Sequence, residues 1–147
     1  YSAHTFRVCL ILRHLFGVEN LVALTAALLH DTIEDTTTDY DDIAEEFGTE
    51  VADCVSVLTK DMRFPEPQRE EVYIARLSQA NDLVRWCKLA DIYDNLTDSK
   101  GLSPGGRKST LARTKRYLDA LSTNPPTQIL PALEIVKQHW QTIAKDG

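Results

Sequence analysis

The sequence predicts a single all-α domain. Apolar residues recur with a helical period along nearly the whole chain, and no segment has the pattern of a convincing strand. Gly and Pro residues, which end helices, fall between the expected helices rather than inside them. The length of 147 residues suits one domain with one core, so we expect a helical bundle without internal repeats.

The first two helices are expected to meet near residue 20. The first runs through Phe6 and Arg13 and stops at Gly17, a favourable residue for a helix C-terminus. Asn20 caps the second, residues 21–29, which is apolar on almost every face. A helix of that kind is expected in the middle of the core.

The remaining helices are bounded by caps and breaks. The segment Thr38–Asp41 resembles a capping box that opens a short helix ending at Gly48, and Thr49 caps a helix to about Leu58. Pro65 and Pro67 break the chain after it. The later elements are expected to be helices over about 68–79 and 82–96, a loop from Ser99 to Gly106, and two final helices over about 107–121 and 127–144.

Composition excludes several classes of protein. The net charge of −6 argues against a nucleic-acid-binding surface, although a small anionic substrate remains compatible if a bound cation supplies positive charge. No apolar run approaches the length that spans a bilayer, and no signal peptide is present, so we expect a cytoplasmic protein without membrane contact. Cys9, Cys54 and Cys87 are far apart, which predicts reduced core residues. The oligomeric state is not predictable from the sequence.

A group of ionisable residues follows the apolar helix. His30 and Glu34, and likewise Asp31 and Asp35, are one turn apart if the helix continues, so the four share one end and one side. An imidazole beside a carboxylate is a mixed ligand pair that suits Mn, Fe or Zn. The simpler interpretation is a solvated helix end, because a His-Asp pair is common by chance.

Two distant residues strengthen the interpretation as a metal site. His4 begins an amphipathic helix, and Asp91 stands among Leu89, Ala90 and Ile92, where a carboxylate needs a partner. Each alone is more often a capped or salt-bridged residue. Together with His30-Asp31 they supply two imidazoles and two carboxylates, enough for one octahedral metal ion with positions left for water.

This pattern resembles the HD superfamily of metal-dependent phosphohydrolases, in which a His is followed by His-Asp and later by Asp. The longer run from Ala26 to Thr36, with Glu34-Asp35 after His30-Asp31, is similar to the hydrolase domain of RelA/SpoT alarmone enzymes and to small stand-alone alarmone hydrolases of the metazoan SpoT homolog type. Further matches occur in the same order: Phe47-Gly48, Val51, Leu58 to Asp61, Lys88 to Asp91, and Asn95.

The resemblance implies a role for each matched residue. It makes His4, His30, Asp31 and Asp91 the metal ligands, with Mn²⁺ the typical ion, although Fe, Co, Ni and Zn fit the same ligands. It makes Glu34 and Asp35 the acidic pair that orients and deprotonates the attacking water.

Four residues are candidates for contacting the substrate. The resemblance places Asn95 near the ribose and phosphates of a nucleotide, and Lys60 and Lys88 fall in family motifs. Each of these lysines is also compatible with a merely solvated side chain. Tyr93, near Asp91 on its helix, is a further candidate for the pocket wall.

The implied reaction is removal of the 3′-pyrophosphate from ppGpp or pppGpp. Two alternatives remain: an HD-type phosphatase acting on another nucleotide, such as a nucleoside monophosphate or NADPH, and a non-catalytic nucleotide-binding module. We expect one HD domain over residues 1–147, with the motifs in 1–99 and two motif-free C-terminal helices over 107–144. Family members carry a basic segment before the first His that contacts the nucleotide, and we expect base recognition to depend on it.

Overall fold

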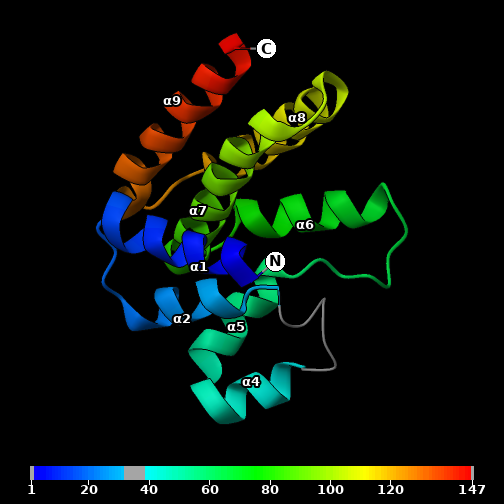
Figure 1. Ribbon diagram of the computed structural model, residues 1–147. Coiled ribbons are helices and arrows are strands. Elements are labelled where there is room, and N and C mark those ends of the chain that lie inside the picture. Colours follow the sequence, from blue (N-terminus) through cyan, green and yellow to red (C-terminus); the bar gives the residue numbers. More distant parts are fainter. Residues whose placement is uncertain (1, 32–38, 147) are drawn as a thin grey trace.

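The computed structural model describes residues 2–31 and 39–146, and within these ranges the chain is helical with no strand, which confirms the all-α prediction (Figure 1). The helices are α1 (Ser2–Leu10), α2 (Leu21–Leu29), α4 (Tyr40–Phe47), α5 (Thr49–Leu58), α6 (Gln68–Ser78), α7 (Asp82–Asp98), α8 (Pro104–Leu121) and α9 (Leu130–Asp146). A π-helical segment, Ile11–Leu15, extends α1, and short 3₁₀ segments, Ser99–Gly101 and Thr127–Ile129, precede α8 and α9.

The central element is α7, which packs against α1, α2, α5, α8 and α9 (Figure 1). Ten of its residues are buried, and three of those carry charges close together: Lys88, Asp91 and Asp94. This placement differs from the expectation that residues 21–29 lie at the centre of the core. α2 is buried through Ala23, Ala26 and Ala27, whereas Leu21 remains 78% exposed.

Several helix ends follow the predicted capping, and three require correction. Thr49 does not cap α5, because it is the first residue of that helix and Gly48 occupies the N-cap position without a side-chain hydrogen bond. Asn20 caps α2 as expected, since its side chain accepts from the Ala23 amide. The capping box of α4 lies one residue later than predicted and pairs Asp39 with Asp42. The expected loop from Ser99 to Gly106 is also shorter, because Ser103 caps α8 and Pro104 occupies its first turn, a position that Pro favours.

The three cysteines are free, as predicted, with Cys54 and Cys87 buried in the core and Cys9 half-buried. Across residues 2–31 and 39–146, no helix combines the length and the apolar character needed to span a membrane.

Candidate metal centre

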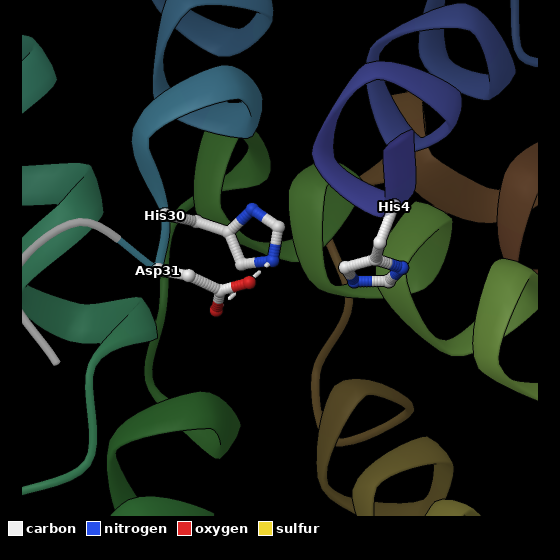
Figure 2. Close-up of side chains that lie close together, drawn as sticks. All are labelled: His4, His30 and Asp31. Carbon is white, nitrogen blue, oxygen red and sulfur yellow. Dashed lines mark ion pairs between the residues drawn. The ribbon is translucent and has the colours of Figure 1, made fainter. Parts of the chain in front are cut away.

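Three helices bring the predicted ligands to one place. His4 lies in the first turns of α1, His30 is the C-terminal cap of α2 with Asp31 next to it, and Asp91 lies in the middle of α7. α1, α2 and α7 pack against one another, so ligands distant in sequence become neighbours. Figure 2 shows the His4 and His30 rings on facing helices, with the Asp31 carboxylate below His30.

The distances suit a shared ion. One donor atom from each of His4, His30 and Asp31 can be chosen so that all three lie within 4.8 Å of one another. Asp91 adjoins them, with its Oδ1 atom 2.8 Å from His4 Nε2 and 3.4 Å from His30 Nε2. Two nitrogen and two carboxylate ligands at this spacing are a donor set that Mn²⁺, Fe²⁺ or Zn²⁺ accepts.

His30 provides the clearest sign that the cluster is built for an ion. Its Nδ1 atom donates to the Ala27 carbonyl at 2.7 Å, which leaves Nε2 as the nitrogen that faces the other ligands. This Nε2 atom is buried, yet it has no hydrogen-bond partner among the described residues. A buried polar atom of this kind is costly unless something binds it. The residues present therefore fit a divalent cation.

The electrostatics of the metal-free cluster depend on Asp91. Its hydrogen bond to His4, opposed by burial and assisted by Asp94, raises the pKa of His4 to about 9. Burial lowers the pKa of His30, but Asp91, Asp31 and the Ala27 carbonyl together outweigh burial, so the net pKa is raised. Burial would also raise the pKa of Asp91, yet Lys88 and the two imidazoles hold that pKa well below its usual range. Without a cation, a proton on His4 thus helps to balance the Asp91 carboxylate.

Lys88 is a buried partner of Asp91 rather than a solvated surface residue. Its Nζ atom lies 3.0 Å from Asp91 Oδ2, and it sits 5.0 Å and 4.4 Å from the ring centroids of Tyr73 and Tyr117. Since Oδ2 is occupied in this way, Asp91 presents Oδ1 to the imidazoles. Lys60 approaches the same two rings and pairs with Glu70 at 2.7 Å.

Asp94 and Arg7 belong to the site but were not predicted from the sequence. Asp94 Oδ2 lies 2.6 Å from His4 Nδ1, and Arg7 contacts both oxygens of Asp94. A signal was available, because Asp94 follows Asp91 by three residues and so shares its helix face. The partner that completes this arrangement, Arg7, emerges only when α1 packs on α7.

The cluster opens onto a cavity of about 510 Å³. Of the predicted substrate-binding residues, Asn95, Lys60 and Lys88 line it, but Tyr93 does not. Tyr93 instead stacks on His139 of α9, with ring centroids 4.0 Å apart, and its contact with the substrate stays a prediction. The other lining residues are Ala3, His4, Arg7, His30, Asp31, Leu58, Tyr73, Asp91 and Asp98. Glu34 and Asp35 lie outside the described residues.

Comparison with known proteins assigns the family. A family model described as HD domain matches residues 1–114, and the chain therefore belongs to the HD domain family. Its fold and its His/Asp cluster agree with this membership.

The similar proteins are named for one activity. The chain is 36% identical over 106 residues to guanosine-3′,5′-bis(diphosphate) 3′-pyrophosphohydrolase MESH1 of Xenopus tropicalis, which covers 72% of this chain and 59% of that protein. It is 32% identical over 143 residues to the Drosophila melanogaster protein of the same name, covering 94% and 80% of the two chains. The chain thus spans about three fifths of the length of the vertebrate relatives, with 59% in the Xenopus protein.

A solved structure shows the same architecture. This chain superimposes on a metazoan ortholog of SpoT, described as hydrolysing ppGpp, with a TM-score of 0.79 and 27% identity. The match covers 94% of this chain and 80% of that one.

Proposed function

We propose that this protein is a metal-dependent phosphohydrolase that removes the 3′-pyrophosphate of ppGpp and pppGpp. The observation that carries the proposal is the convergence of two imidazoles and two carboxylates on one wall of a cavity that also holds two lysines. The two lysines suit an anionic substrate, and the activity for which the relatives are named supports the choice of a guanosine alarmone.

The four ligand candidates would hold one divalent cation, and we propose Mn²⁺. They are His4, His30, Asp31 and Asp91. Bound there, the cation would lower the pKa of the attacking water and offset negative charge on the phosphate under attack. The protein's part is to keep the ligands in place, through Ala27 for His30 and Lys88 for Asp91.

The hydrolytic step needs a base. We assign it to Glu34 and Asp35, which follow the His30-Asp31 pair in sequence. One carboxylate accepts a proton from water as its oxygen bonds to phosphorus, while the bond between that phosphorus and the ribose 3′ oxygen breaks. The 3′ oxygen takes up a proton, so the products are GDP or GTP and pyrophosphate. General-base assistance of this kind contributes a factor of about 10²–10⁴ in rate.

Substrate binding is assigned to the part of the cavity away from the ligands. Lys60 is a candidate for a phosphate contact and Asn95 for a hydrogen bond to the nucleotide, since both line the cavity. Lys88 adds positive charge there while it holds Asp91. We further propose that the domain comprises residues 1–147, because α8 and α9 pack on α7 and complete its burial.

The test is pyrophosphate release from ppGpp by the purified, metal-free chain, before and after Mn²⁺ is added. We expect release only with Mn²⁺, and its loss in Asp31→Ala, whose fold is checked by circular dichroism. Parallel assays of phosphate release from nucleoside monophosphates and NADPH cover the alternative phosphatase. Release from those substrates alone would overturn the alarmone assignment, and release from none would support a non-catalytic module.

A further inference from the structure

We propose that Asp94 is a positioning residue of the metal centre, which holds His4 through Nδ1 so that Nε2 is presented to the ion. The inference rests on the proposed function, because it needs a metal ion beside His4. It concerns a residue that does not itself reach the ion, and whose effect is therefore transmitted through the imidazole.

The contact between Asp94 and His4 is short and protected. Asp94 Oδ2 lies 2.6 Å from His4 Nδ1, and the two side chains are only 5% and 16% exposed. The opposite nitrogen, Nε2, points to Asp91 Oδ1 at 2.8 Å, inside the cluster. A proton kept on Nδ1 by a carboxylate leaves the lone pair of Nε2 for a metal, and the carboxylate makes that nitrogen a stronger ligand.

Arg7 orients the Asp94 carboxylate, which in turn orients the His4 ring. Its Nε atom donates to Asp94 Oδ1 at 2.8 Å, and its Nη2 atom donates to Oδ2 at 3.0 Å. Two parallel bonds of this kind set the plane of a carboxylate as well as its position. Arg7 also pairs with Asp98, one turn further along α7. The chain of contacts thus runs from α7 through Asp94 to the His4 ring.

The two imidazoles are oriented by different means. His30 donates its Nδ1–H to a neutral backbone carbonyl of its own helix, that of Ala27. His4 lies in the first turns of α1 and is held instead by a charged side chain of another helix. His4 therefore depends on α7 for its orientation, whereas the partner of His30 cannot be removed by substitution.

The experiment measures Mn²⁺ binding to the metal-free full chain by isothermal titration calorimetry. Asp94→Asn keeps the shape and one acceptor oxygen but removes the charge, and Asp94→Leu removes the acceptor as well. We expect affinity to fall about 10- to 100-fold, more for Leu than for Asn. Asp119→Asn is the control, because Asp119 is also a carboxylate paired with a cation, Lys115 of α8, and it does not line the cavity. It should bind Mn²⁺ as the wild type does.

A double-mutant cycle separates positioning from a general structural effect. In a His4→Ala background, Asp94→Asn should cost no further Mn²⁺ affinity, since the ring it acts on is absent. Equal losses with and without His4, or a loss in Asp119→Asn as large as in Asp94→Asn, would overturn the inference. So would unchanged affinity in both Asp94 variants, while the metal site would stand. Absence of Mn²⁺ binding by the wild type would instead overturn the proposed function and this inference with it.

Discussion

At the scale of single residues, the Asp91 carboxylate links the two imidazoles of the candidate metal site to the Lys88 ammonium group. Its Oδ1 atom faces the two imidazoles and its Oδ2 atom faces Lys88, so both oxygens of one buried carboxylate are engaged. Without a cation, a proton on His4, whose pKa is raised to about 9, helps to compensate its charge. A divalent ion would take over that compensation, and the His4 proton would have to leave.

Mn²⁺ affinity should therefore rise with pH. His4 has a metal-free pKa raised from 6.5 to about 9, so it is protonated at pH 7 and must release a proton to become a ligand. Each displaced proton strengthens apparent affinity about tenfold per pH unit below that pKa, and the effect ends once the pH exceeds it. Calorimetric titrations between pH 6.5 and 8, repeated in buffers of different ionisation enthalpy, would report both the slope and the protons released. A flat profile with no proton release would contradict the account.

The proximity of the four candidate ligands was predictable from the sequence, but the residues that hold those ligands in place were not. His30-Asp31 stands out because polar residues end an apolar helix, and Asp91 stands out because its neighbours are apolar. Lys88 and Asp94 look like ordinary charges on a helix, and only the packing of α7 against α1 and α2 shows what they hold. The position of the Tyr93 ring was not predictable from the sequence either, since its stacking on His139 depends on the packing of α9 against α7.

At the scale of helices, local sequence signals predicted where helices begin and end better than they predicted which helix is buried. Asn20 and Gly48 mark real helix ends because the cap acts on the nearest turn of backbone. The sequence could not show that the apolar face of α2 would leave Leu21 exposed while the more polar α7 became central. Which helix is central depends on contacts between distant segments, which a local pattern does not contain.

Arg85 of α7 provides a test of how helix ends are joined. Its guanidinium donates to four carbonyls. Two belong to Ser78, the last residue of α6, and Ala80 just after it, and two belong to Leu121, the last residue of α8, and Thr123 just after it. Arg85→Met should lower the free energy of unfolding by about 3 kcal/mol, because it leaves several acceptors without their donor. Urea denaturation monitored by circular dichroism measures the difference.

The matched control is Arg113→Met, since Arg113 is exposed on α8. It should change the free energy of unfolding by no more than about 0.5 kcal/mol. Similar losses in the two variants would show that the carbonyl contacts of Arg85 contribute little.

At the scale of the whole molecule, the candidate ligands lie on three helices that are far apart in sequence. A bound ion would therefore join α1, α2 and α7, and it would stabilise the folded chain over the unfolded one. Mn²⁺ at 100 times its dissociation constant should add about 2.7 kcal/mol, which corresponds to a rise of about 5–10 °C in Tm for a chain of this size. Thermal unfolding with Mn²⁺ and with EDTA measures the shift, and Asp31→Ala should lose most of it. A wild-type Tm that does not respond to Mn²⁺ would contradict this expectation.

The central claim is that His4, His30, Asp31 and Asp91 bind one metal ion. The most direct measurement is a crystal structure of the chain grown with Mn²⁺, with anomalous scattering recorded on the high-energy side of the manganese absorption edge. We predict an anomalous peak within bonding distance of His4 Nε2, His30 Nε2 and the carboxylates of Asp31 and Asp91. An empty cluster in crystals saturated with Mn²⁺, or a peak held by other residues alone, would contradict the account.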